Sequence, residues 1–195
     1  AVLIAAPATL LVAWRFGNRK YYLSSLLLIV YAMLPFFVRF EHKKPQAREL
    51  VTIAVMSAVA VASRAAFIMV PFFKPLTGIV MITGMALGPE AGFLTGAVSG
   101  FVSNFIFGQG PWTPWQMFAF GVAGFLAGVL AKKGWLTAEK RLPAGLFGGI
   151  CVLLLIGPIL DTCSLFTMST EITSASAAGI YLAGLPVNAV HAFAT

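Results

Sequence analysis

The chain has 195 residues, of which 59% are hydrophobic and 10% are charged, and its mean hydropathy is +0.93. Soluble domains do not have such a composition, so we expect an all-α, polytopic helical bundle in a cell membrane. The net charge of +7 does not indicate nucleic-acid binding, because the 13 lysines and arginines stand in short clusters at the ends of apolar runs.

Apolar runs follow one another between charges, prolines and glycines. A helix perpendicular to the membrane needs about 20 residues to cross it, and several runs are shorter. Short runs fit a bundle whose helices are tilted, broken or end at a solvent-lined cavity. The expected helices cover residues 2–14, 21–38, 50–70, 76–87, 91–107, 115–131, 143–168 and 180–195.

Lysine and arginine set the expected orientation. They cluster in segments 39–49 and 132–142, whereas the connections at 108–114 and 169–179 contain neither residue. Basic residues favour the cytoplasmic side, so the first two segments should lie inside and the last two outside. Arg15, Arg19 and Lys20 do not fit this pattern if the 21–38 helix spans fully, so the orientation of the first forty residues stays open.

The helix expected at 50–70 carries a ladder of alanines, each four residues from the last. At 3.6 residues per turn they form a nearly straight ridge, and in lipid such a ridge lets a second helix approach closely. We favour docking of a partner subunit for this ladder and internal packing for the glycines of the next helices, with the reverse assignments as alternatives. The ladder consists of Ala54, Ala58, Ala62 and Ala66, and the glycines are Gly92, Gly96, Gly100, Gly121, Gly124 and Gly128.

Polar side chains occur at a similar depth in several helices. Ionisable groups inside a membrane are costly, so each is a candidate functional residue. The helical rise puts Arg64 about 21 Å and Asp161 about 27 Å along their outward-running helices, and Asn104 about 20 Å along its own. With Gln116 and Asn188 they form one outer layer, which predicts a ligand site. The alternative for Arg64 and Asp161 is a buried ion pair, and the two interpretations are compatible.

The segment SNFIFGQGPWTPWQM, residues 103–117, separates two of these helices. Its prolines and glycines prevent a continuous helix, and it contains no charge. Its tryptophans and amides, with Gln109 and Trp112 in the connection, have the groups needed to stack on and hydrogen-bond a polar organic ligand. The alternative is an aromatic anchor at the membrane interface.

Other polar residues have simpler expected roles. We expect Lys74 and Glu90 to be solvated residues of connections. Cys151 and Cys163 would lie about 18 Å apart on one helix, too far for a disulfide. No nucleotide-binding, metal-binding or hydrolase motif occurs, so we expect neither an enzyme nor a bound metal or cofactor.

Four segments together resemble a known family: the alanine ladder, FFKP, GPEAGFLTGAVSGFVSNF and GQGPWTPWQM. The chain is similar to the S component, the substrate-binding membrane subunit, of energy-coupling-factor (ECF) vitamin importers. The resemblance covers residues 48–195 and implies a six-helix core whose last helix is cut short. Residues 1–47 would be an added hydrophobic extension of one or two helices and a basic linker.

The resemblance implies capture of a vitamin outside the bacterial plasma membrane. Ala54, Ala58 and Ala62 would contact a transmembrane coupling protein, the T component, which works with two cytoplasmic ATPases. The outer layer is rich in amides and aromatic rings, which suits a large, near-neutral ligand, and the chain resembles members assigned to cobalamin. Riboflavin, pantothenate and a queuosine-type base remain open. By position, the ligand role falls to Phe73, Asn104, Gln109, Trp112 and Gln116, beside Arg64, Asp161 and Asn188.

Two other classes of function compete with this interpretation. An integral membrane enzyme would use Arg64, Asp161 and His191, and replacing Asp161 would then remove turnover. A small channel or stand-alone transporter would give flux in liposomes without any partner.

Overall fold

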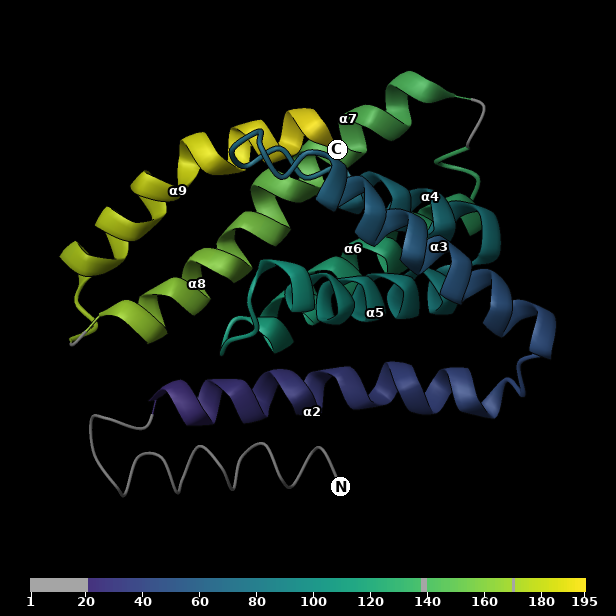
Figure 1. Cartoon of the computed structure of the whole chain (residues 1–195), viewed down its shortest axis with the longest axis horizontal. Helices are drawn as coiled ribbons and strands as arrows, with labels where there is room; N and C mark the ends of the chain where they lie inside the picture. Colours follow the sequence, from purple (N-terminus) through teal and green to yellow (C-terminus); the bar gives the residue numbers. More distant parts are fainter. Residues whose placement is uncertain (1–20, 138–139, 170) are drawn as a thin grey trace.

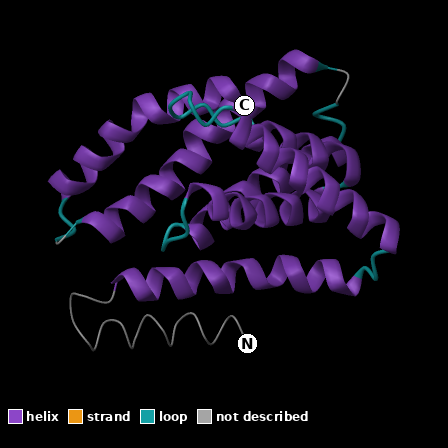
Figure 2. Ribbon diagram, viewed as in Figure 1, coloured by secondary structure: helices purple, strands orange, loops and turns teal. Residues whose placement is uncertain are grey.

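The computed structural model describes residues 21–137, 140–169 and 171–195, and in these ranges it contains helices and short connections but no strand (Figures 1 and 2). The all-α prediction is therefore confirmed. The helix expected at 2–14 lies outside the described residues. The helices are α2 (Tyr21–His42), α3 (Ala47–Ala66), α4 (Leu76–Leu87), α5 (Pro89–Phe107), α6 (Thr113–Lys132), α7 (Arg141–Cys151), the π-helix η1 (Val152–Ile156), α8 (Gly157–Met168) and α9 (Ser174–Ala194).

Five helical stretches of the described residues are long and apolar enough to cross a membrane, and α4 is a shorter apolar helix. The longest stretch, Arg141–Met168, joins α7, η1 and α8 into one continuous rod. Its π turn ends just before Pro158, which has no backbone N–H to continue the regular hydrogen-bond series. Single π turns of this kind are frequent at functional sites.

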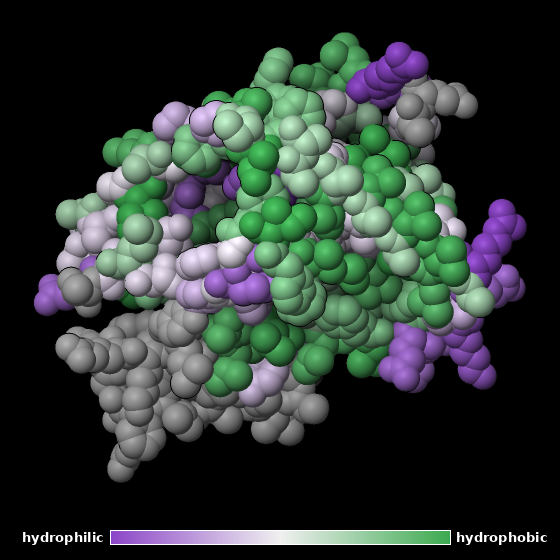
Figure 3. Space-filling view, viewed as in Figure 1, coloured by the Kyte–Doolittle hydropathy of each residue, from purple (hydrophilic) through white to green (hydrophobic). Residues whose placement is uncertain are grey.

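The helices run between two different ends of the molecule (Figure 1). At the end drawn on the right, α2 ends, α3 begins, α6 ends and α7 begins, and Figure 3 shows hydrophilic side chains gathered there. We call this the basic end. Away from the basic end, the connections at 108–112 and 169–173 lie towards the left of the view, and the 67–75 connection lies beside the C-terminus; we call the part of the molecule that carries these three connections the loop end. The lysine- and arginine-rich segments and the connections without them thus lie at opposite ends, as the sequence predicts.

Helices α4, α5 and α6 pack backbone against backbone. A Cβ atom added to Gly92 would come within 2.6 Å of Gly84 Cα, and one added to Gly128 would come within 2.6 Å of Pro89 Cα. A Cβ atom on Gly96 would meet the backbone of Gly121 at 2.6 Å. The prediction that these glycines serve internal packing is confirmed.

Helix α3 presents two different faces. Ile53, Ala60 and Arg64 are buried against the rest of the bundle, whereas the alanine ladder is exposed along its whole length. Internal packing among the described residues is therefore the wrong explanation for this ladder. The exposed residues are Ala54, Ala58, Ala62 and Ala66.

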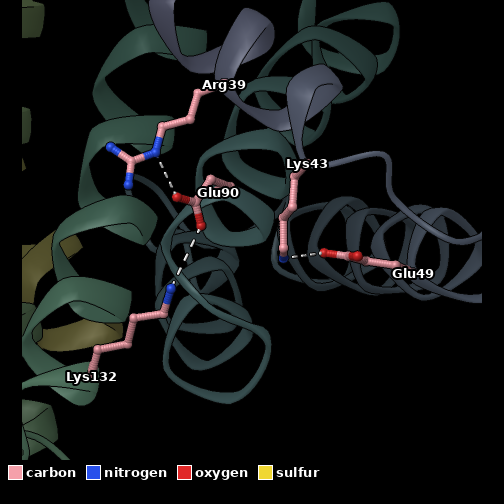
Figure 4. A network of polar contacts seen from close by, with 5 residues as sticks. All are labelled: Arg39, Lys43, Glu49, Glu90 and Lys132. Atoms are coloured by element: carbon pink, nitrogen blue, oxygen red, sulfur yellow. Dashed lines mark hydrogen bonds and ion pairs between the residues drawn. The ribbon is translucent and has the colours of Figure 1, made fainter.

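The basic end is held together by ion pairs (Figure 4). Arg39 Nε of α2 lies 2.9 Å from Glu90 Oε1 of α5, and Lys132 Nζ of α6 lies 3.9 Å from Glu90 Oε2. Glu90 is only 7% exposed, so the prediction of a solvated turn residue is wrong. The reason is that α2 covers this part of α5, where Phe36 stacks on Phe93 with ring centroids 4.0 Å apart.

Candidate functional site

Arg64, near the end of α3, is buried at the loop end. Its Nη1 donates hydrogen bonds to Ser103 Oγ at 2.6 Å and to Asn104 Oδ1 at 3.2 Å, both on α5. Its guanidinium carbon lies 4.2 Å from the centre of the Phe107 ring. Its Nε is buried and has no hydrogen-bond partner among the described residues. The guanidinium is therefore fixed in orientation, and part of its donor capacity is unused.

The hydrogen bonds continue from Arg64 across the start of α6. Asn104 Nδ2 donates to Thr113 Oγ1 at 3.0 Å, and Thr113 Oγ1 donates to Gln109 Oε1 at 2.9 Å. We call Arg64, Ser103, Asn104, Thr113 and Gln109 the outer polar chain. The sequence predicted Arg64, Asn104 and Gln109 as site residues but missed Ser103 and Thr113. Their positions in the sequence could have indicated them, because Ser103 precedes Asn104 and Thr113 is the first residue of the helix that carries Gln116.

Among the described residues, the side chains of Trp112 and Gln116 make no hydrogen bond to the outer polar chain. Trp112 is 41% exposed, and its indole Nε1 donates to Gly108 O of its own connection at 3.3 Å. Gln116 is half-buried, and its Oε1 is buried without a hydrogen-bond partner in the described part of the chain. Gln116 thus adds an unused acceptor to the unused donor of Arg64.

Asp161 and Asn188 form a second polar group, between α8 and α9. Asn188 Nδ2 donates to Asp161 Oδ2 at 2.9 Å. A Cβ atom on Gly184 would lie 2.5 Å from Asp161 Oδ1, and one on Gly157 would lie 2.5 Å from Asn188 Nδ2. Each polar side chain therefore occupies the space left by a glycine of the opposite helix.

The two polar groups are separate in the structure. Among the described residues, no ion pair joins Arg64 to Asp161, so the alternative of a structural ion pair is not the observed arrangement. The polar partners of Arg64 are neutral, and the hydrogen-bond partner of Asp161 is Asn188. The predicted single layer is thus divided between α3, α5 and α6 on one side and α8 and α9 on the other.

Aromatic rings at the loop end connect these helices. Trp115 of α6 faces Phe166 of α8 with ring centroids 6.0 Å apart. Phe73, one of the predicted site residues, contacts Phe67 at 4.7 Å and Phe193 of α9 at 6.5 Å between centroids. Figure 3 shows a hollow beside α9 with hydrophilic side chains at its base.

Lys74, which follows Phe73, differs from the expected solvated lysine. It is half-buried, and loss of solvation, with a further effect of the Arg64 charge, lowers the pKa of Lys74 to about 8. A lysine ammonium is disfavoured by burial and by a neighbouring positive charge, which explains the direction. Deeper in the bundle, the side chains of Thr77 and His191 are hydrogen-bonded at 2.8 Å.

The chemistry of these groups suits reversible binding of an organic molecule. Hydrogen-bond donors and acceptors lie beside aromatic rings in a partly desolvated region, as in small-molecule sites generally. The described residues contain no group of three or more His, Cys, Asp or Glu side chains that could hold a metal. Cys151 and Cys163 are buried and free.

A comparison with protein families identifies the chain. The family model described as "ECF-type riboflavin transporter, S component" matches residues 44–195, which is most of the chain. No solved structure matches the chain. Members of this family are membrane subunits that bind a transporter's substrate, and they are not enzymes. The chain therefore belongs to the S component family of ECF-type riboflavin transporters.

Proposed function

We propose that this chain captures a vitamin at its loop end, outside the cell, and passes it inward with ATP hydrolysed by partner subunits. The observation that carries the proposal is the family match over residues 44–195 together with the outer polar chain at one end of the bundle. Residues 48–195 act as the substrate-binding core, and residues 1–47 are an extension that adds α2 to one side.

A flavin is the ligand that the family description supports. Its planar ring system has an apolar face for stacking and an edge of carbonyl and N–H groups, which matches aromatic rings beside Asn104 and Gln116. Cobalamin, the ligand that the sequence suggested, is the second candidate, but the family description does not favour it. Direct binding measurements with both vitamins decide between them.

The proposed binding residues come from five helices and two connections. Arg64, Asn104 and Gln109 would act through the outer polar chain, and Gln116 would use its unpartnered oxygen. Asp161 and Asn188 would close the site from α8 and α9. The remaining aromatic contacts are Phe73 and Trp112.

The exposed alanine ladder of α3 is the proposed docking face for the T component. Ala54, Ala58 and Ala62 leave a shallow surface on which a second helix can lie. The two ATPases would act through that T component.

A bulky substitution in the ladder tests the proposal. Ala58→Trp should abolish riboflavin uptake in cells that also produce a T component and the ATPases, while the purified subunit still binds riboflavin with wild-type affinity. Leu154→Trp, on an exposed position of η1, is the control and should retain uptake. Normal uptake by Ala58→Trp would show that the docking face is wrong, and flux in liposomes with this chain alone would favour a stand-alone transporter.

A further inference from the structure

The acidic residues of the chain are distributed unevenly. There are six in total, and four of them belong to the basic-end segments of the sequence. Only Asp161 and Glu171 belong to the half near the loop end. Asp161 accepts a hydrogen bond from Asn188, and Glu171 is exposed in the connection between α8 and α9. Few carboxylates are therefore available to balance positive charge near the loop end.

Arg64 is a buried positive charge that forms no ion pair within the described ranges of the chain. The ion pairs of the described residues join Arg39 and Lys132 to Glu90 and Lys43 to Glu49, all at the basic end. Arg64 is 7% exposed, and its hydrogen-bond partners Ser103 and Asn104 are neutral. A buried charge is costly unless it is paired, so this arrangement favours an anion supplied by another molecule.

Two observations indicate where that anion would bind. Arg64 Nε is buried without a partner, and the bonds to Ser103 and Asn104 with the Phe107 ring hold the guanidinium plane in place. Lys74 is half-buried and follows Phe73, whose ring lies 4.7 Å from that of Phe67, so the connection that carries Lys74 packs against the chain just beyond Arg64. A fixed guanidinium with a nearby ammonium is the usual protein receptor for a phosphate or carboxylate.

We propose that Arg64 and Lys74 bind one anionic group, a phosphate or a carboxylate, of the captured ligand. This inference rests on the proposed function and narrows it: the preferred ligand is an anionic flavin such as riboflavin 5′-phosphate, with the ring system against the aromatic residues. It replaces the near-neutral ligand that the sequence suggested. That expectation followed from the amides and aromatic rings of the outer layer, and it did not consider whether Arg64 has an acidic partner.

A phospholipid headgroup offers the same anionic chemistry. A lipid bound at Arg64 would copurify with the protein. If Arg64 instead binds a phosphate of the ligand, the protein should bind a phosphorylated flavin more tightly than the same flavin without the phosphate. The experiment therefore needs one arm for each source.

The first arm compares riboflavin with riboflavin 5′-phosphate, which differ by one phosphate. Dissociation constants for the purified full chain are measured by quenching of flavin fluorescence. The wild-type protein should bind riboflavin 5′-phosphate at least tenfold more tightly than riboflavin. Arg64→Gln should reduce this ratio to about one, whatever its effect on riboflavin affinity itself, and Arg64→Lys should give an intermediate ratio. Arg48→Gln, which removes the same charge from an exposed position at the basic end, should keep the wild-type ratio.

The outcomes separate this inference from the proposed function. Equal affinities in the wild-type protein, or tighter binding of riboflavin, would overturn the anionic-group inference and leave vitamin capture intact. Absence of binding for both flavins would overturn both. In the second arm, native mass spectrometry that finds phosphatidylglycerol on the wild-type protein but not on Arg64→Gln would assign the anion to a lipid and also overturn the inference.

Discussion

The two ends of the bundle handle buried charge in opposite ways. At the basic end, Glu90 is buried but lies between Arg39 and Lys132, whose side chains are 69% and 63% exposed. At the loop end, Arg64 is buried among neutral groups, and the neighbouring cation is Lys74. Each cluster joins side chains of different helices, so either could be interpreted as having only a structural role.

The difference lies in whether the charge is balanced within the chain. The basic-end cluster is balanced and partly in water, as expected for ion pairs that only join helices. Within the part of the chain that the structure describes, the Arg64 charge is buried and has no acidic partner, which costs stability unless a second molecule supplies the opposite charge. The following predictions test that distinction.

Removing the amide at the centre of the outer polar chain should have the largest effect. Asn104→Ala takes one acceptor from Arg64 and one donor from Thr113. At the low end of about 1–3 kcal/mol for each unsatisfied group, this corresponds to flavin binding weaker by about 30-fold or more. Titration of the purified variant measures it. Ser99→Ala is the control, because Ser99 is equally buried on α5 but its hydroxyl bonds to Thr95 O of the same helix. Equal behaviour of the two variants would remove the outer polar chain from the site.

Neutralising the two buried charges should change thermal stability in opposite directions. Glu90→Gln breaks the basic-end pairs and should lower the unfolding midpoint of the ligand-free protein by about 3 °C, corresponding to about 1 kcal/mol. Arg64→Gln removes an unbalanced buried charge and should raise the midpoint by a similar amount. Thermal unfolding in detergent measures both. If Arg64→Gln lowers the midpoint as Glu90→Gln does, Arg64 is a structural residue and the distinction fails.

Binding of an anionic flavin should weaken as the pH rises above about 8. Below the Lys74 pKa of about 8 the ammonium is charged with or without ligand, so affinity is constant. Above that pH, Lys74 of the free protein loses its proton, whereas a bound anion raises the Lys74 pKa so that the complex keeps the proton. Between the pKa of the free protein and that of the complex, each pH unit should therefore lower the affinity by up to about tenfold. Arg64 of α3 and His191 of α9 are the other titratable groups that interact with Lys74.

Titrations with riboflavin 5′-phosphate from pH 6.5 to 9.5 measure this dependence. Lys74→Met should remove it, and Lys133→Met, at the basic end, should not. A dependence that survives in Lys74→Met would assign the titration to another group.

The smallest effect is expected at Trp112. Its indole is 41% exposed and bonds to its own connection, so Trp112→Ala should weaken flavin binding only about threefold, near the low end for a partly desolvated aromatic contact. The same fluorescence titration measures it. Unchanged binding would favour the interfacial-anchor role for this tryptophan.

Helix positions were largely predictable where proline or glycine residues bound an apolar run. Helix α4 covers Leu76–Leu87 as expected, because Pro75 and Gly88 bound the apolar run. Helix α3 ends at Ala66, and residues 67–70 form turns, although the apolar run continues to Val70. The sequence prediction extended the helix too far because apolar content alone does not distinguish a turn from a helix. Helix α9 begins at Ser174, six residues before the expected start at 180, because Thr173 and Ser176 form a capping box in a weakly apolar segment.

The sequence predicted individual polar residues of the candidate site, but it did not predict which of them contact one another. Counting residues along helices placed Arg64 and Asp161 at similar depth, yet depth along a helix does not say which face a side chain occupies. Asp161 fits over Gly184 on α9, whereas Arg64 points to α5. Contacts of this kind depend on how helices cross, which the sequence pattern does not specify.

The glycine contacts between α4, α5 and α6 also determine how this protein tolerates mutation. At Gly92, Gly96 and Gly128 the neighbouring atoms are backbone, so no side chain can adopt another rotamer to admit even a methyl group. In a saturation scan these positions should accept almost nothing, although the atoms nearest to a Cβ added there belong to none of the proposed ligand residues. Variation in ligand preference would therefore arise at the loop end and on α8 and α9, around a three-helix block whose sequence can hardly change.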